Sequence, residues 1–218
     1  MIVVVGSRHD AAATALVAAW SGDDAALLSA DDHIAAGWVI DPADPARGVA
    51  VVAGQTVDIA EIRGVLTRRP SVLAEELVAI DAEDRAYVAA EVNAMLVAWL
   101  GALPCPVVNR PTPTSLCGAG WGIVEWRRAA ARCGFHLARR PAGRLQRVVV
   151  CGDRVFGARS IATKQRACAL ARAADVTLLE LQLAAGRFVA ASSCPDLSSA
   201  DVRGAVLDEL LGSCGRSR

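Results

Sequence analysis

The spacing of apolar runs changes halfway along the chain, and this change is the strongest constraint on the fold. In the first half, apart from one predicted hairpin over Val49–Ile59, the apolar runs are separated by long segments that include predicted helices, and they lie at Ile2–Val5, Val65–Thr67 and Pro106–Asn109. Strands that alternate with helices favour a parallel sheet, because a parallel connection needs a crossover of a dozen or more residues. We therefore expect an α/β first half with a mostly parallel sheet and flanking helices, among them helices over residues 11–19 and 82–100, the latter capped by Asp81.

The second half instead pairs its apolar runs across short turns that contain glycine. One predicted hairpin covers Arg147–Arg159 with its turn at Cys151–Arg154, and the other covers Leu178–Ala191 with its turn at Ala184–Gly186. Predicted helices surround these hairpins, over residues 123–133, 163–174 and 199–211. This order predicts an antiparallel α+β layer. A link rich in Gly, Pro and Thr, residues 112–122, suggests two domains, 1–115 and 116–218.

Composition excludes several classes of protein. Hydrophobic residues make up 54% of the chain, and 23 basic residues balance 23 acidic ones. A chain this apolar is not disordered, and zero net charge provides no field that attracts nucleic acid or an anionic membrane. The N-terminus has no basic region of a signal peptide, and the longest apolar stretch, residues 94–108, contains two prolines. We expect a soluble, cytoplasmic protein with no nucleic-acid or membrane partner.

Metal and cofactor signals are weak. The seven cysteines form no CxxC pair, and His9, His33 and His136 lack the spacing of metal ligands. We predict no metal site and no cofactor, and we interpret the cysteines mainly as small apolar core residues. Lys164 is the only lysine, so chemistry that needs two lysines is excluded.

Arginines follow two of the predicted parallel strands. Arg68 and Arg69 follow one strand, and Arg110 follows the next. The carboxyl ends of parallel strands meet at one edge of a sheet, where a planar guanidinium could hold a carboxylate or a peptide through two contacts. The alternative is solvated ion pairs with Asp or Glu. Similarly, Trp121 and Trp126 could cover an apolar ligand or pack between the two halves.

The order of these segments resembles the N-terminal (pre-ATP-grasp) domain of ATP-grasp ligases. The matching residues are Val65–Pro70, Glu91–Trp99 and Val107–Pro111. In the second half, Val148–Arg159 is similar to the family's V-V-G-D-x-V-F-A-A-R hairpin, and Leu178–Pro195 is similar to its closing D-L-x…D-G-x-Y-x-x-x-E-x-N-P segment. The resemblance covers most of the chain. It points to the branch that cross-links or ligates ribosomal peptides, the graspetide-type ligases, and to relatives that resemble ribosomal-protein glutamate ligases.

Departures from the family pattern affect its metal site and its lid. The resemblance places Ser192 and Cys194 where the family has the Glu and Asn that hold magnesium, and it leaves Glu180 as the one acidic position. Magnesium prefers hard, anionic oxygen ligands, so this set implies a degenerate site. Only Ala142–Arg147 stands where the family inserts a subdomain with nucleotide-clamping lysines, and Lys164 is no substitute. The second half therefore resembles a truncated ATP-grasp domain.

The favoured hypothesis is a non-catalytic pseudoenzyme that binds a ribosomal precursor peptide and presents it to a modifying enzyme. Phosphoryl transfer depends on positioning and charge neutralisation, which the degenerate site lacks. Truncated proteins of this kind resemble accessory peptide-binding proteins of natural-product pathways of the crocagin type. The candidate peptide-binding residues are Arg68, Arg110, Trp121, Arg127 and Arg159. A peptide could also add to the edge of either hairpin.

Two other hypotheses remain open. The chain could be a minimal ATP-dependent carboxylate–amine ligase that uses Glu180, Lys164 or a cysteine, or a structural dimerisation subunit of a biosynthetic complex. We also expect a homodimer. The mean hydropathy of +0.36 is high for a soluble monomer, and the ligases that the chain resembles self-associate.

Overall fold

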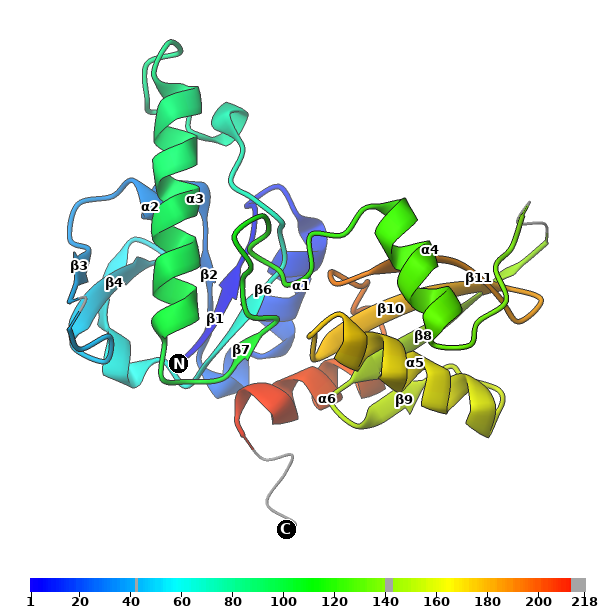
Figure 1. The fold of residues 1–218 in the computed structure, drawn as a ribbon. Coiled ribbons are helices and arrows are strands. Elements are labelled where there is room, and N and C mark those ends of the chain that lie inside the picture. Colours follow the sequence, from blue (N-terminus) through cyan, green and yellow to red (C-terminus); the bar gives the residue numbers. More distant parts are fainter. Residues whose placement is uncertain (42, 140–142, 213–218) are drawn as a thin grey trace.

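A parallel sheet forms the centre of the first half. The computed structural model describes residues 1–41, 43–139 and 143–212 of the chain (Figure 1). The four strands of this sheet are β1 (Ile2–Val5), β2 (Ala25–Leu28), β6 (Gly64–Thr67) and β7 (Val107–Val108). They lie in the order β2-β1-β6-β7, and all three neighbouring pairs are parallel. The prediction of a mostly parallel sheet is therefore confirmed.

Helices cover both faces of this sheet. Helix α1 (Ala11–Ala19) connects β1 to β2, and α3 (Arg85–Ala102) lies between β6 and β7 in the chain. Helix α3 begins three residues later than the expected Ala82, because the Asp81 carbonyl accepts turn hydrogen bonds from the backbone of residues 84 and 85. The expected Asp81 cap is therefore wrong, and Asp84 is the N-cap residue.

A small antiparallel sheet extends the first half. Its strands are β3 (Val39–Ile40), β4 (Gly48–Val52) and β5 (Gln55–Asp58), in that order. Ala53 and Gly54 connect β4 to β5 with φ values of 51° and 75°, which suits the twist of a two-residue hairpin. The short helices of this half are α2 (Ala30–His33), η1 (Ser21–Asp23), η2 (Ile59–Glu61) and η3 (Ala74–Glu76).

The second half contains the predicted antiparallel sheet. Its strands are β8 (Leu145–Cys151), β9 (Arg154–Phe156), β10 (Leu178–Ala184) and β11 (Arg187–Ser192), in the order β11-β10-β8-β9. Its helices are α4 (Ile123–Arg132), α5 (Ile161–Ala173) and α6 (Ala200–Leu210). Every neighbouring pair of strands is antiparallel, as the two glycine-centred turns predict.

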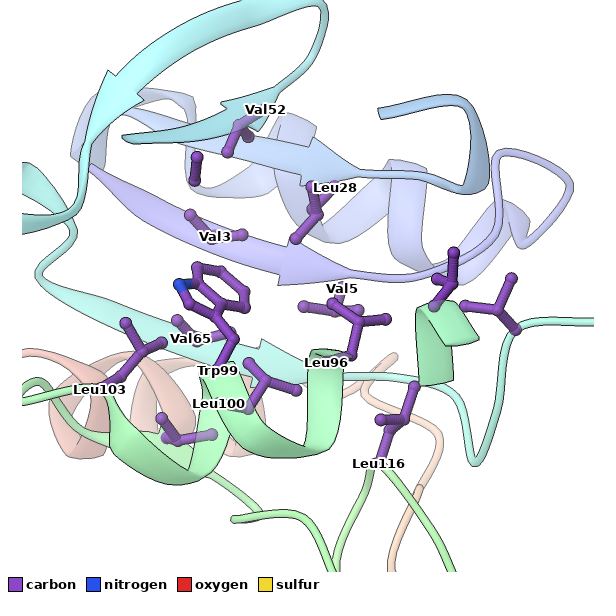
Figure 2. Packing of buried hydrophobic residues seen from close by; sticks show 14 of the residues in the cluster. Val3, Val5, Leu28, Val52, Val65, Leu96, Trp99, Leu100, Leu103 and Leu116 are labelled. Atoms are coloured by element: carbon purple, nitrogen blue, oxygen red, sulfur yellow. The ribbon is translucent and has the colours of Figure 1, made fainter. Parts of the chain in front are cut away.

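Three hydrophobic clusters hold these layers together. In the first, Val3 and Val65 of the parallel sheet contact Trp99 and Leu100 of α3 (Figure 2). In the second, the face of the antiparallel sheet that carries Val148 packs against α4 and α5. The opposite faces of both sheets share the third cluster with α1 and α6, so α6 lies between the two sheets. The two halves therefore have a common core, although the predicted boundary between residues 115 and 116 stays a prediction.

Helix α6 packs closely on the parallel sheet at Gly64. A Cβ atom at this position would lie 2.5 Å from the carbonyl oxygen of Leu210, so only glycine permits the contact. In the described part of the chain, no helix combines the length and the apolar character that membrane crossing requires. Ala142, the first residue of the short segment at the place of the family's insertion, and Cys214, one of the seven cysteines, lie outside the described residues.

Candidate functional site

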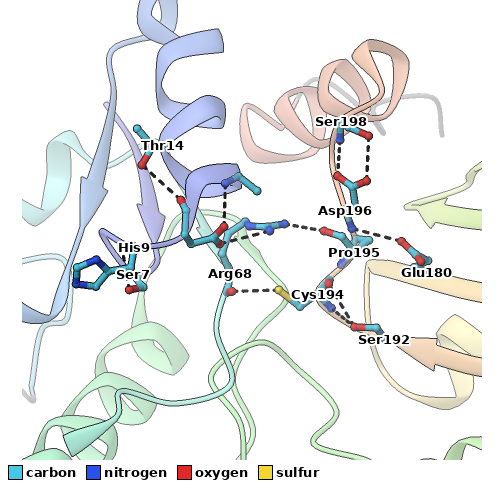
Figure 3. Close-up of polar contacts among 12 residues, drawn as sticks. Ser7, His9, Thr14, Arg68, Glu180, Ser192, Cys194, Pro195, Asp196 and Ser198 are labelled. Atoms are coloured by element: carbon cyan, nitrogen blue, oxygen red, sulfur yellow. Dashed lines mark hydrogen bonds and ion pairs between the residues drawn. The ribbon is translucent and has the colours of Figure 1, made fainter. Parts of the chain in front are cut away.

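The two halves meet where β6 ends and where the chain leaves β11. Arg68 follows β6, and its guanidinium donates to the carbonyl of Pro195 at 2.6 Å and lies 3.5 Å from the Asp10 carboxylate (Figure 3). The Cys194 thiol donates to the backbone carbonyl of Arg68 at 3.1 Å. The Arg68 side chain is only 8% exposed. In the structure, this predicted peptide-binding residue therefore links the two halves of the chain through hydrogen bonds.

The positions that resemble a metal site lie together on β10 and after β11. Glu180 and Ser192 are opposite each other in the antiparallel register of β10 and β11. Glu180 is buried, and one of its oxygens accepts from the backbone N–H of Asp196 at 3.3 Å. The Ser192 hydroxyl accepts from the backbone N–H of Cys194 at 3.1 Å.

Arg147 of β8 occupies the charged centre of this group. Its guanidinium lies 3.3 Å from the Glu180 carboxylate and donates to the Asp196 carboxylate at 2.9 Å. Although partial burial opposes the change, hydrogen bonds from Ser198 and Arg147 lower the pKa of Asp196. The carboxylates of Glu180 and Asp196 thus both pair with the guanidinium of Arg147.

This set of donors does not fit magnesium. Magnesium needs several hard oxygen ligands in octahedral geometry. Here one carboxylate is paired with Arg147, and the other two positions are a neutral hydroxyl and a thiol. Among the residues that the structure describes, no group of three His, Cys, Asp or Glu side chains could hold a metal ion.

Two other predicted binding residues are engaged by nearby carbonyl groups. Arg110 donates to four carbonyl oxygens at the end of α3 and just beyond it, at 3.1–3.2 Å. Arg127 donates to the carbonyl of Ala138 at 3.0 Å. Both arginines therefore stabilise the backbone near them through these hydrogen bonds. The structure does not bring these two side chains into one site with Arg68, and peptide binding by them stays a prediction.

The two tryptophans next to the link stack edge to face. The ring centroids of Trp121 and Trp126 lie 4.8 Å apart, and the ring planes make an angle of 63°. Trp126 is buried in the cluster beneath α4, and Trp121 packs against that cluster. Both rings therefore pack in a cluster of the second half, and the expected packing between the two halves is not what this cluster shows; Trp121 keeps part of its surface accessible.

Arg159 lies in a different environment, at a cavity of about 880 Å³. The cavity opens between the start of β8, the turn after β10 and the start of α5, and its lining includes Arg144, Leu145, Arg147 and Arg159. No carboxylate lines it, and neither Arg144 nor Arg159 forms an ion pair with another described residue.

Sequence reasoning missed Arg144 and Arg147. Arg144 stood in the segment interpreted only as a shortened insertion, and Arg147 was interpreted only as the end of that segment and the start of a predicted hairpin. The detectable signal was two arginines at the ends of that hairpin, Arg147 and Arg159, with Arg144 shortly before it.

The outer edge of β11 is partly covered. Phe188 exchanges backbone hydrogen bonds with His136 and Ala138, at 2.8 and 2.9 Å, so residues 136–138 act as a short fifth strand there. A peptide cannot pair at Phe188 without displacing this segment.

A second polar cluster lies at the carboxyl edge of the parallel sheet. His33 and Arg69 are buried, and Arg69 forms an ion pair with Glu76. Burial, reinforced by the nearby Arg69 charge, lowers the pKa of His33 to about 4. Burial opposes the shift at Glu76, but hydrogen bonds from Ser7 and Arg69 lower the pKa of its carboxyl. Arg69 stands at the sheet edge as predicted, but its charge is neutralised within the fold.

Comparison with known proteins shows the fold. No protein-family model and no curated protein matches the sequence. Among solved structures, the macrocyclase MdnC from Microcystis aeruginosa MRC, bound with precursor peptide MdnA, has a TM-score of 0.71 and 9% identity. That alignment covers 98% of this chain and 100% of the other. The ATP-grasp ligase PsnB, complexed with a phosphomimetic variant of minimal precursor, Mg and ADP, has a TM-score of 0.70 and 14% identity. That alignment covers 98% of this chain and 98% of the other.

A third similar structure is the RimK domain protein ATP-grasp from Sphaerobacter thermophilus DSM 20745. It has a TM-score of 0.52 and 11% identity, and the alignment covers 97% of this chain and 98% of that chain. The chain thus has the ATP-grasp-like fold of peptide ligases, as the motif order implies. At this level of identity the likeness concerns the fold.

Proposed function

We propose that this protein binds a ribosomally made precursor peptide in a biosynthetic pathway and does not ligate it. The observation that carries the proposal is the position of Arg147. Its guanidinium lies against Glu180 and Asp196, where the resemblance would place a magnesium ion. A guanidinium cannot bridge and polarise the phosphates of a nucleotide as a metal ion does, because it has no open coordination positions.

The cavity next to Arg147 supports the peptide-binding part of the proposal. Arg144 and Arg159 present cationic forks, and Leu145 of the lining and nearby Ile161 expose apolar surface, 40% and 75% respectively. Such a mixed surface suits a peptide segment that carries both carboxylates and apolar side chains. Two structures with the same fold, those of MdnC and PsnB, contain precursor peptides.

In this proposal the protein catalyses no reaction on the peptide, so its role after binding is to deliver the peptide to a partner enzyme. We also propose a homodimer. Both points are testable by measuring the molar mass in solution, with and without the candidate modifying enzyme from the same gene cluster.

Calorimetric titration with the precursor peptides encoded nearby tests the peptide site. Arg159→Glu reverses a charge at the cavity without breaking a contact within the described structure, and Arg128→Glu reverses an exposed charge on α4 outside the cavity. We expect Arg159→Glu to weaken binding by about tenfold or more, the effect of losing one charge-assisted contact. Arg128→Glu should leave the affinity unchanged. Equal affinities for both variants would place the peptide elsewhere.

Mass spectrometry of the peptide tests the non-catalytic part. After incubation with ATP and magnesium, the peptide mass should be unchanged, because each amide or ester bond formed would remove one water. The thermal midpoint of the protein should also be insensitive to ATP with magnesium. A peptide that loses water would overturn this part of the proposal and leave the binding result intact.

A further inference from the structure

Two cysteines from distant parts of the chain meet at the junction of the halves. Cys117 belongs to the link between β7 and α4, and Cys194 follows β11. The two thiols interact, and this interaction shifts their pKa values in opposite directions. The Cys117 sulfur also lies 3.7 Å from the hydroxyl oxygen of Ser193, the residue before Cys194. Cys117 and Cys194 are hereafter called the thiol pair.

Both segments are fixed by contacts that do not involve sulfur. On the Cys194 side, Asn109 donates to the carbonyl of Ser193 at 3.0 Å, and Arg68 donates to that of Pro195 at 2.6 Å. On the Cys117 side, the backbone N–H of Leu116 donates to the carbonyl of Pro70 at 2.8 Å. The thiols are therefore held together by the fold.

The surroundings of Cys117 stabilise its thiolate. The main cause is a hydrogen bond from Cys194, which lowers the pKa of Cys117 by more than burial raises it. Hydroxyl groups of Ser115 and Ser193 add to it, and the pKa of Cys117 falls to about 6. The same hydrogen bond, with burial, raises the pKa of Cys194. The Cys194 thiol has one proton, and its alternative acceptor is the carbonyl of Arg68 at 3.1 Å. The charged groups near Cys194 are Arg68 and Asp10.

We propose that the thiol pair is a redox modification site, which a peroxide converts into a disulfide that links the two halves. The Cys117 thiolate attacks one peroxide oxygen, the O–O bond breaks, and hydroxide leaves and takes a proton, which gives a sulfenic acid. The Cys194 sulfur then attacks the Cys117 sulfur. The S–O bond breaks, water leaves with the Cys194 proton, and the S–S bond forms. The overall reaction turns two thiols and one hydrogen peroxide into a disulfide and two waters.

Other functions for the pair fit less well. A structural zinc site needs four ligands, and the described residues include no third His, Cys, Asp or Glu positioned to complete a metal site. By contrast, no thiol interaction acts on half-buried Cys133, whose pKa is raised by its partial burial alone. A thiolate that is stabilised beside a second thiol is typical of redox-active cysteines.

The test is oxidation of the fully reduced protein with a small excess of hydrogen peroxide. Intact mass should fall by two hydrogens, and the non-reduced peptide map should show one crosslink, between residues 117 and 194, that dithiothreitol removes. Cys194→Ser should leave a sulfenic acid at Cys117 that dimedone traps, whereas Cys133→Ser should form the crosslink like the unchanged protein. Crosslinking should be half-maximal in rate near pH 6, below the pKa of about 8.5 of a free cysteine.

Two results would overturn the proposal. One is oxidation of Cys105 or Cys168 while the thiol pair stays reduced. The other is a crosslink that involves any other cysteine. Alkylation of the unchanged protein gives a measurement that needs no variant, since Cys117 should react as a thiolate below pH 7.

Discussion

The buried imidazole of His33 makes the stability of the fold depend on pH in a narrow, predictable window. Neither ring nitrogen has a hydrogen-bond partner, and the side chain is enclosed beside Arg69. Burial and the Arg69 charge lower the pKa of His33 to about 4, while Asp32 and Glu76 oppose the shift. The unfolded chain therefore takes up a proton at a higher pH than the folded chain does.

The magnitude follows from the two pKa values. Above pH 6.5 the imidazole is neutral in both states, and stability is complete. As pH falls from 6.5 toward 4, only the unfolded state gains the proton, and the free energy of unfolding decreases by about 3 kcal/mol in total. About 2 kcal/mol of this is lost by about pH 5. The lowered pKa values of Glu76 and Asp196 remove stability only below their unfolded values of 4.5 and 3.8.

Urea unfolding followed by tryptophan fluorescence measures the effect. His33→Leu removes the titrating group and replaces it with an apolar side chain, so its stability should change little between about pH 7 and pH 5. The unchanged protein should lose about 2 kcal/mol over the same interval. An identical loss in both proteins would refute the reasoning, because the pH dependence would then arise from other groups.

Three further predictions follow from particular contacts. Arg147→Ala should lower the free energy of unfolding by about 1–2 kcal/mol, because it leaves buried Glu180 without its cation, although Arg147 is 43% exposed and partly screened. Adding Glu180→Gln should restore part of this loss in urea titrations. Gly64→Ala should cost about 1–3 kcal/mol by pushing α6 away, whereas Gly101→Ala, whose Cβ would meet nothing within 4 Å, should stabilise α3 by about 0.5–1 kcal/mol. Calorimetry checks both glycine variants. Oxidation of the thiol pair should raise the melting temperature. The closed loop restricts the unfolded chain, which can increase the free energy of unfolding by at most about 4 kcal/mol.

Strands flanked by strong turn signals were predictable, and those defined by pairing were not. The run Ile2–Val5 is strongly apolar, and the hairpin turns contain glycine at positions of positive φ, such as Gly152 and Gly186. By contrast, β2 has the sequence Ala-Ala-Leu-Leu, whose residues favour helices. It becomes a strand because its backbone pairs with β1.

The candidate site shows the same division. The motif order placed Glu180 and Ser192 at one candidate site, and the structure pairs them across β10 and β11, but only through a register shift between Gln182 and Leu183 that the hairpin turn does not predict. The partners of the predicted arginines were not predictable, since Arg68 contacts Pro195 from a segment 127 residues away. Arg147 was missed as a partner of Glu180 because the cross-strand neighbours of a residue depend on which strands pair.

The sequence by itself determined the alternation of strands and helices in the first half, the hairpins of the second half, and the serine and cysteine side chains at positions 192 and 194. These properties are local, because backbone propensity, turn chemistry and side-chain type act within a few residues. Only the tertiary structure decided which charges neutralise each other, which arginines face a cavity, and that two distant thiols lie together. Those outcomes depend on the packing of α6 between the two sheets, and a contact across such an interface leaves no periodic signal in the chain.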